Sequence, residues 1–283
     1  MWKNRSKLLF ATPLLIALLV WSQMGLYAAH KTLGWDIRFN IIDLCNHLLL
    51  KLGFGSISPV LNLLVAYTAV VTLWLVAKQA YAARQALRKV QERTHHPLTA
   101  MLQARFPEDK HSLIVIAAKQ PFALTLGLFR PRIVLSSGLL ELLDPSEIEA
   151  VYYHERSHRR HRDPLKTFVL LVVSKVMWYV PILDWCSRHY KIAREIIADH
   201  EAMTVMGTPA SLGSALLKLL KKQDRPQAVD FAYVSFADTS INYRIHHIID
   251  PESAASPQLP VMLAVISLPV VLVLSGVFFL SLL

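Results

Sequence analysis

Two histidines and a glutamate in the run AVYYHERSHRRHRDP (residues 150–164) are the residues of this sequence best suited to chemistry. His154 and His158 are four residues apart, a spacing that places both imidazoles on one face of a helix. Two imidazoles so placed can bind one zinc ion, while Glu155, one step round the helix, can take a proton from water at the metal without binding it. This is the H-E-x-x-H arrangement of zinc hydrolases. The alternative is a solvated basic helix, because the same run carries four arginines.

A third ligand is available in the run IAREIIADHEA, where Glu195 and Asp199 are again four residues apart. A carboxylate on a second helix would complete a site of two histidines and one glutamate, with a fourth position left for water. Asp199, one turn further on, can accept the remaining ring N–H of a histidine ligand and fix its orientation. The pattern Glu-x-x-x-Asp alone also fits the charged face of an amphipathic helix, so the prediction of zinc rests on both runs together.

The elements that must position these residues can be read from the flanking sequence. Asp144 is a favourable N-cap, Pro145 suits the first helical position and Glu147 follows three residues after the cap, so a helix is predicted over about 145–162. Pro164 ends it. Three short β-like runs separated by Pro or Gly come before this helix; they are SLIVIAA, FALTLG and RIVLSS.

The composition indicates a membrane protein that also carries a compact domain. The chain has 283 residues, of which 54% are hydrophobic and 18% charged, with a mean hydropathy of +0.38. That is too apolar for an ordinary soluble domain and too charged for a bundle of membrane helices alone. Cys45 and Cys186 are too few for a disulfide framework or a zinc knuckle, so we expect free thiols.

Three uncharged stretches are long enough to cross a bilayer, which takes about 20 apolar residues. They lie at 8–29, at about 58–77 and within 253–283. The first is an alternative candidate for a signal peptide, but no small-x-small cleavage site follows it. We therefore predict a pair of membrane helices in residues 1–84, a zinc domain in 85–252 and a last membrane helix in 253–283. A helical extension over 77–94 is expected to continue the second span.

Basic residues near the ends of these stretches predict the orientation. Lys3, Arg5 and Lys7 precede the first stretch, and five more basic residues follow the second within residues 78–93. Because positive residues mark cytoplasmic loops, we expect the N-terminus and the zinc domain in the cytoplasm and the C-terminus outside, in a bacterial-type cytoplasmic membrane. The net charge of +10 is thus explained without nucleic acid. The arginines of residues 156–162 are interpreted as facing anionic headgroups.

One further apolar segment, 165–185, lies between the two runs of predicted ligands. Lys166 and Lys175 interrupt it. It cannot cross the membrane once, because Glu195 must reach the same metal as the histidines. We interpret it as a helix that lies on or in the membrane surface or is buried in the domain; a short hairpin that dips into the membrane is the less favoured alternative.

The runs RPRIVLSSGLLELLDPSEIEAVYYHERSHRRHRDP and AREIIADHEA resemble the membrane-integral BlaR/MecR-type zinc metallopeptidases. HtpX-like and CAAX-protease-like enzymes are more distantly similar. The resemblance covers about residues 85–250 and implies an α+β fold of mostly helices with a small three-stranded sheet. It implies a gluzincin site, in which His154, His158 and Glu195 bind one Zn²⁺ and Glu155 is the general base.

The resemblance also implies a substrate strand and an oxyanion stabiliser. The run RIVLSS, with Ile133, Val134, Leu135 and Ser136, is expected to be the edge strand that binds an extended peptide. A cationic or phenolic side chain stabilises the oxyanion in related enzymes. The candidates here are Arg244, Tyr243, His246, His247 and His200.

The substrate suggested by the resemblance is a BlaI-like transcriptional repressor. Two alternatives stay open, an HtpX-like quality-control protease of membrane proteins and a zinc-binding signal transducer without proteolytic activity. We expect no penicillin-binding sensor domain, because the sequence contains no Ser-x-x-Lys. The lipid bilayer and a protein or peptide substrate are the expected partners.

Overall fold

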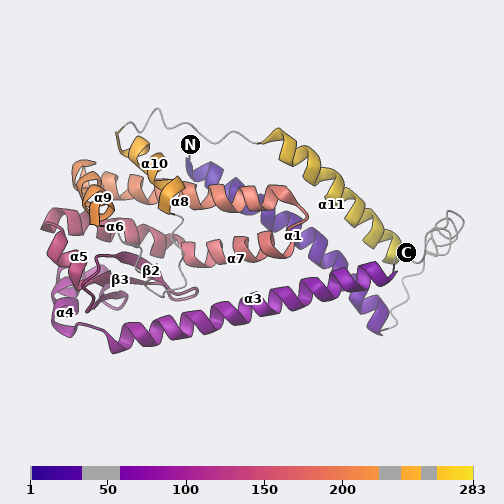
Figure 1. The fold of residues 1–283 in the computed structure, drawn as a ribbon, viewed down its shortest axis with the longest axis horizontal. Helices are drawn as coiled ribbons and strands as arrows, with labels where there is room; N and C mark the ends of the chain where they lie inside the picture. The colour runs from indigo at the N-terminus through magenta and orange to yellow at the C-terminus, as the bar shows by residue number, and fades with distance from the viewer. Residues whose placement is uncertain (1, 34–57, 223–236, 250–259, 283) are drawn as a thin grey trace, which may run out of the picture. The chain divides into compact units, whose positions relative to one another are not determined.

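The computed structural model describes residues 2–33, 58–222, 237–249 and 260–282 (Figure 1). The chain divides into two compact units. The first unit comprises residues 1–6, 78–169 and 189–257, and the second comprises 7–77, 170–188 and 258–283. Cys45 lies outside the described residues, whereas Cys186 is a buried free thiol.

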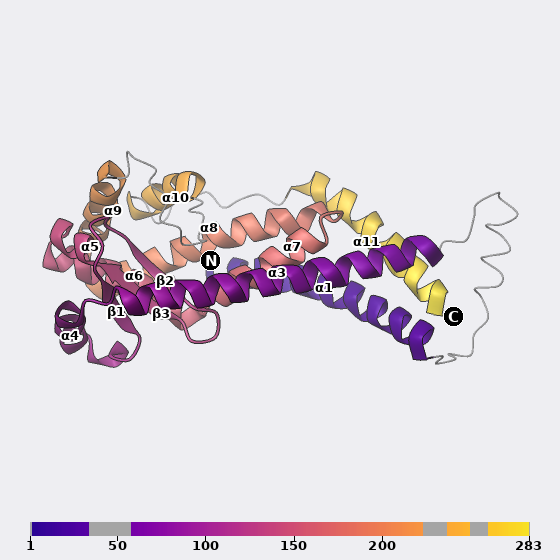
Figure 2. The ribbon, with the colours of Figure 1, turned by 60° about the horizontal axis from the view of Figure 1, so that its bottom comes forward.

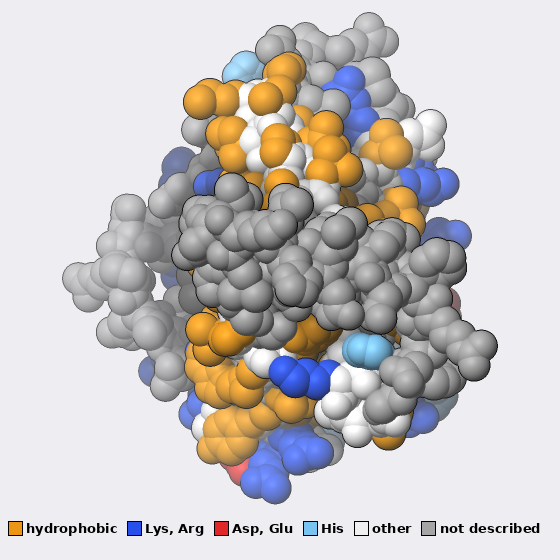
Figure 3. Space-filling view, turned by 90° about the vertical axis from the view of Figure 1, so that its right-hand side faces the viewer, with side chains coloured by type: hydrophobic (Ala, Val, Ile, Leu, Met, Phe, Trp, Pro, Cys, Tyr) orange, Lys and Arg blue, Asp and Glu red, His pale blue; other side chains and the backbone are white. Residues whose placement is uncertain are grey.

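Within the described residues, three helices are long and apolar enough to cross a membrane, judged by length and composition. They are α1 (Trp2–Leu33), α3 (Ser58–Glu92) and α11 (Val261–Leu282), and they match the three predicted stretches. The helical extension after the second stretch is confirmed, because α3 runs without a break to Glu92. Large apolar side chains such as Leu63, Leu73 and Val265 are exposed on these helices. Figure 3 shows apolar side chains gathered over much of the described surface on the face in view.

The apolar segment 165–185 is a helical hairpin and not the single helix that we favoured. α7 (Asp163–Val176) and α8 (Pro181–Met206) are joined by a turn over residues 177–180. Pro181 begins α8, where its missing N–H costs nothing. The backbone amide of Ile182, in the first turn of α8, has no acceptor within the helix and donates to Ser267 Oγ of α11 at 3.0 Å. A chain that turns back in this way returns Glu195 to the unit that holds the histidines.

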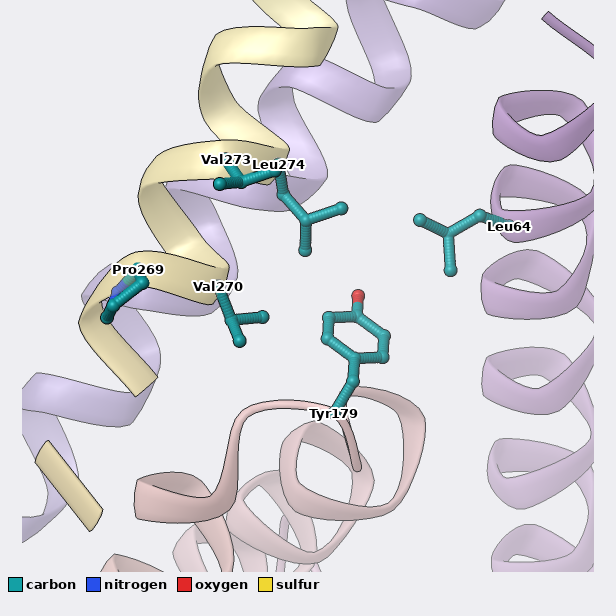
Figure 4. Close-up of a pocket in the computed structure, with 6 residues that line it drawn as sticks. All are labelled: Leu64, Tyr179, Pro269, Val270, Val273 and Leu274. Atoms are coloured by element: carbon teal, nitrogen blue, oxygen red, sulfur yellow. The ribbon is translucent and has the colours of Figure 1, made fainter. Parts of the chain in front are cut away.

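The turn of the hairpin also lines an apolar cavity of about 440 Å³ within the second unit (Figure 4). Tyr179 points into it, with Leu64 of α3 opposite and α11 along one side. The Tyr179 hydroxyl is buried and has no hydrogen-bond partner among the described residues. The remaining lining residues are Pro269, Val270, Val273 and Leu274.

The predicted sheet is present in the first unit, but its strand order differs from our expectation. β1 (Leu113–Ile116), β2 (Ala123–Leu126) and β3 (Arg132–Ser136) are arranged in the order β1-β3-β2. β3 pairs in parallel with β1 and antiparallel with β2. The prediction that Ile133, Val134, Leu135 and Ser136 form an edge strand is therefore wrong. These four residues are buried in the central strand, and an uninterrupted apolar run of this kind is typical of a strand covered on both faces.

Helices pack around this sheet and form the core of the first unit. α4 (His96–Arg105) contacts β1, and α6 (Pro145–His161) contacts β2 and β3 (Figure 2). The main cluster of buried side chains includes Phe106, whose ring stacks on that of Tyr152 at a centroid distance of 3.7 Å. The smaller elements are the 3₁₀ turn η1 (Pro107–Asp109), α5 (Ser137–Leu142), α9 (Ala210–Lys222) and α10 (Ala237–Ile249).

The limits of α6 follow from its sequence as predicted. The backbone N–H of Asp144 donates to the Glu147 carboxylate at 2.8 Å, which is one half of a capping box. At the other end Arg162 adopts a left-handed conformation with φ of 54° and closes the helix. Asp163 and Pro164 then begin α7, so the chain changes direction between the two helices.

Candidate metal centre

Three acceptor atoms from two helices converge in the first unit. α6 supplies His154 and His158, whose Nε2 atoms are 3.2 Å apart. α8 supplies Glu195, whose Oε2 lies 3.4 Å from His154 Nε2 and 3.6 Å from His158 Nε2. Both histidines are buried and the Glu195 side chain is 15% exposed. These are the three residues that the sequence suggested as ligands, brought together across 37 residues of chain by the α7–α8 hairpin.

Each histidine is oriented by a buried carboxylate on its other ring nitrogen. Nδ1 of His154 lies 2.8 Å from Asp199 Oδ1, and Nδ1 of His158 lies 2.8 Å from Asp163 Oδ2. The Tyr190 hydroxyl donates to the second oxygen of Asp163 at 3.2 Å. A carboxylate accepts only from a protonated nitrogen, so the hydrogen bond to Asp163 puts the proton of a neutral His158 ring on Nδ1. The Asp199 oxygen beside Nδ1 of His154 favours the same tautomer there through its charge, because that contact is close in distance but lacks the geometry of a hydrogen bond.

This arrangement tests whether a metal fits. With the protons on Nδ1, both Nε2 atoms present lone pairs toward each other and toward the Glu195 carboxylate. Three acceptors thus face one another, and among the described residues the only donor that the ion pairs place near them is Arg244, 3.7 Å from Glu195 Oε2. Buried acceptors without partners are costly. A metal cation satisfies all three at once, and the two oriented imidazoles have the partners that histidine ligands normally have. The residues therefore fit a metal.

Two arginines keep the acidic residues of the site ionised. Nη2 of Arg194 lies 3.1 Å from Glu195 Oε1, and Nη1 of Arg244 lies 3.7 Å from Glu195 Oε2. Burial alone raises the pKa of Glu195, but neighbouring positive charge, including that of Arg194, outweighs it and holds that pKa well below its ordinary value. Burial likewise raises the pKa of Asp199, and Arg244 lowers it below the ordinary value. Both carboxylates are thus anionic at neutral pH.

Of the five candidates for an oxyanion stabiliser, Arg244 has the strongest connection to the site. Its guanidinium donates from Nε and Nη2 to the two oxygens of Asp199, each at 2.8 Å, so α10 is fixed to α8 beside the ligands. His200 and His246 are exposed, and Tyr243 is half-buried. His247 is buried with both ring nitrogens unpaired among the described residues, and its ring lies 6.0 Å from that of His200.

Glu155 is buried beside the edge strand and takes no part in the carboxylate–histidine contacts. The Thr125 hydroxyl of β2 lies 2.8 Å from Glu155 Oε2 and 3.0 Å from the Glu155 backbone oxygen. This contact joins β2 to the helix that carries the histidines. Glu155 follows His154 in α6, and its carboxylate is not among the three converging acceptors.

Sequence reasoning overlooked three residues that position the site. Asp163 holds His158, Tyr190 holds Asp163, and Thr125 holds Glu155. The signal for Asp163 was present, because this acidic residue stands five positions after the second histidine, just beyond the predicted end of the helix. Tyr190 and Thr125 carry no local signal, since their partners are 27 and 30 residues away.

Comparison with known proteins decides the family. A family model described as BlaR1 peptidase M56 matches residues 44–248. The chain belongs to this family. The match covers most of the chain and includes all the residues of the candidate centre. The predicted resemblance to BlaR/MecR-type peptidases is thereby confirmed.

Individual relatives fall into two groups. Protease HtpX homolog 2 of Methanosarcina mazei is 24% identical over 201 residues, which are 59% of this chain and 67% of that protein. Regulatory protein BlaR1 of Bacillus licheniformis is 25% identical over 120 residues, 41% of this chain and 20% of that protein. Methicillin resistance mecR1 protein of Staphylococcus aureus is 22% identical over 151 residues, 52% of this chain and 26% of that protein.

These matches and the three long apolar helices indicate a membrane protease with a site suited to a metal. The chain spans only a fifth to a quarter of BlaR1 and MecR1, so nothing else of those proteins is carried over with the match.

Proposed function

We propose that the protein is a zinc endopeptidase in which His154, His158 and Glu195 hold the ion and Glu155 is the general base. The observation that carries the proposal is the set of separations between the three acceptors, 3.2, 3.4 and 3.6 Å. Ligand atoms about 2.0–2.1 Å from a tetrahedral zinc are separated by about 3.3 Å. Two nitrogens and one carboxylate oxygen are also the donor set of catalytic zinc, with a position left for water.

Zinc in such a site polarises a carbonyl and lowers the pKa of water to about 7. The remaining roles belong to the chain. Glu155 Oε2 accepts the proton of the attacking water, and Thr125 orients that carboxylate by donating to it. Glu155 then returns the proton to the leaving amine. Arg244, held by Asp199 and facing Glu195, is the cation best placed to stabilise the negative charge that develops on the carbonyl oxygen.

The substrate strand is reassigned to β2. Within the described residues, β2 pairs only with β3, so its other side is a free edge. The backbone N–H of Ser136 donates to Phe122 O, and hydrogen-bonded pairs alternate along an antiparallel ladder. Leu124 therefore bonds to β3, while the backbone groups of Ala123 and Thr125 point to the free edge. An extended peptide can add to this edge beside Glu155.

A pair of proline variants tests this assignment. Ala123→Pro removes a donor from the free edge only, which an edge strand tolerates. We expect it to lower peptide cleavage by about fivefold or more, since the lost hydrogen bond and its steric consequences cost about 1 kcal/mol or more. Leu124→Pro breaks the ladder to β3 and should destabilise the domain. Ala123→Val, which keeps the N–H, is the matched control. A folded Ala123→Pro protein that cleaves at the control rate would exclude β2 as the substrate strand.

The proposed substrate is a transcriptional repressor and the proposed location of the site is the cytoplasm. The matches to BlaR1 and mecR1 support a regulatory target, and the basic residues before α1 and after the second span support the orientation. A reporter fused after Arg93 and another after Asp230 should both give a cytoplasmic signal. An outward signal from either fusion contradicts the proposed orientation.

A quality-control protease is the second candidate function, favoured by the several HtpX homologs among the relatives. The two functions predict different substrates. Cleavage of one repressor at one bond, with damaged membrane proteins left intact, would support the regulatory function. Broad cleavage of unfolded membrane proteins would support the second.

A further inference from the structure

Another cavity lies in the first unit, on the side of α6 that bears its arginines. It is lined by cationic side chains. It has a volume of about 670 Å³. Two of its arginines are Arg130, from the turn between β2 and β3, and Arg132, the first residue of β3. Four come from the C-terminal half of α6 and its cap; they are Arg156, Arg159, Arg160 and Arg162. His111 also lines the cavity, and no acidic side chain from the described part of the chain does.

The charge of this arginine cavity is only partly compensated by its surroundings. Arg159 pairs with the buried Asp109, and Arg156 lies 3.4 Å from both Asp109 and Glu108. The structure gives no ion pair to the other four arginines among the described residues. Arg130 and Arg160 are exposed at the mouth of the cavity. Four uncompensated guanidinium groups around one cavity attract an anion, and planar donor pairs of this kind match phosphate oxygens.

An apolar side chain stands beside these charges. Phe129, at the tip of the β2–β3 turn, is 79% exposed and lines the same cavity. The turn is tightly specified, because Gly127 has φ of +108° and a Cβ there would lie 2.9 Å from the backbone oxygen of Arg130. The fold thus holds an aromatic ring in the open next to Arg130.

From these observations we propose that the arginine cavity binds the phosphate headgroup of an anionic phospholipid, with Phe129 against the acyl-chain side of that lipid. A phospholipid offers both an anionic head and an apolar body, which an acidic peptide or free phosphate does not. The chain already belongs to a family of membrane proteases, so such lipids are its neighbours. Arg162 also directly precedes α7, whose second half belongs to the unit of candidate membrane helices. Clusters of about four or more basic residues in membrane proteins bind headgroups of this kind.

The test uses the full chain in a neutral detergent, with bound lipid counted by native mass spectrometry. The probes are dioleoylphosphatidylglycerol, dioleoylphosphatidylcholine and inorganic phosphate. The double variant Arg130→Ala/Arg160→Ala removes two exposed cations. Each basic residue at an anionic surface contributes about fivefold, so binding of phosphatidylglycerol should weaken about 30-fold. The control Lys221→Ala/Lys222→Ala removes two exposed cations from the end of α9 and should leave binding within about twofold.

Phe129→Ser separates a lipid from a free anion. It should weaken phosphatidylglycerol binding by at least about tenfold, the effect of losing one buried aromatic contact, and leave phosphate binding unchanged. A melting curve for each variant establishes that it is folded. The proposal is overturned if the double arginine variant binds phosphatidylglycerol like the control, or if phosphate binds as tightly as the lipid. It is also overturned if a poly-glutamate peptide, and not the lipid, loses affinity in that variant.

Discussion

The two sides of α6 both carry basic residues, histidines on one side and arginines on the other, and these residues face different partners. On one side His154 and His158 each face a buried carboxylate through Nδ1, and their other nitrogens converge on Glu195. On the other side Arg159 pairs with Asp109, while Arg160 is exposed at the edge of the arginine cavity. Both sides come from the single run HERSHRRH. What separates the metal centre from a basic surface is therefore the set of acids that α7, α8 and η1 bring to each side.

The largest expected effect comes from Glu155, the proposed base on the side of the candidate metal centre. Glu155→Gln keeps the size of the side chain but cannot accept a proton, so cleavage should fall by about 10²–10⁴-fold. Metal content should not change, because Glu155 is outside the ligand set. Glu149→Gln is the matched control on the same helix, where an exposed carboxylate pairs with Arg105 at 2.8 Å. Equal losses in the two variants would contradict the role of Glu155, and the measurement is the single-turnover cleavage rate.

A smaller effect is expected from the acid that orients His158. Asp163→Asn weakens the contact to Nδ1 and should lower metal affinity about 10–100-fold, the usual cost of removing a partner of a histidine ligand. Added metal should restore most of the cleavage activity. Competition with a chelator of known affinity measures the change. Unaltered affinity would mean that Asp163 serves the fold alone.

The acid on the arginine side should behave in the opposite way. Asp109 is buried and accepts from Tyr152 at 2.9 Å as well as pairing with Arg159. Asp109→Asn leaves a guanidinium without its counter-charge, which should cost about 3 kcal/mol of unfolding free energy. For a domain of this size the Tm should fall by about 10 °C. Metal affinity per folded molecule should stay the same, and a loss of affinity like that of Asp163→Asn would erase the distinction between the two sides.

The smallest effect on stability is expected from Arg160→Ala. Arg160 is exposed, and the structure gives it no ion pair among the described residues. Its removal should change the unfolding free energy by less than about 0.5 kcal/mol. Thermal unfolding of the metal-loaded protein measures this. A drop as large as that of Asp109→Asn would reveal a structural partner for this side chain.

Local sequence signals predicted the elements well. Asp144, Pro145 and Glu147 located the start of α6, and three short β-branched and apolar runs located the strands. The spacing of His154 and His158 brought them to one face of the helix, because that spacing is set by helix geometry alone. Glu195 followed from the same reasoning applied to a second helix.

Contacts between segments that are far apart in the sequence could not be predicted from such local signals. The run RIVLSS was taken for an edge strand, although its burial on both faces makes it central, and only the ladder partners reveal that. A hairpin in this segment was the less favoured alternative, yet a turn of four residues, 177–180, suffices when Pro181 restarts the helix. Arg244 could not be chosen over its neighbours, because its contact with Asp199 spans 45 residues.

Metal content tests the central claim most directly. Wild-type protein purified in detergent should carry about one zinc per chain by elemental analysis. Glu155→Gln should keep it, Glu195→Ala should lose part of it, and the double variant His154→Ala/His158→Ala should carry none. Circular dichroism of the double variant establishes that its helices are retained. Full zinc occupancy in a folded double variant would contradict the metal centre described above.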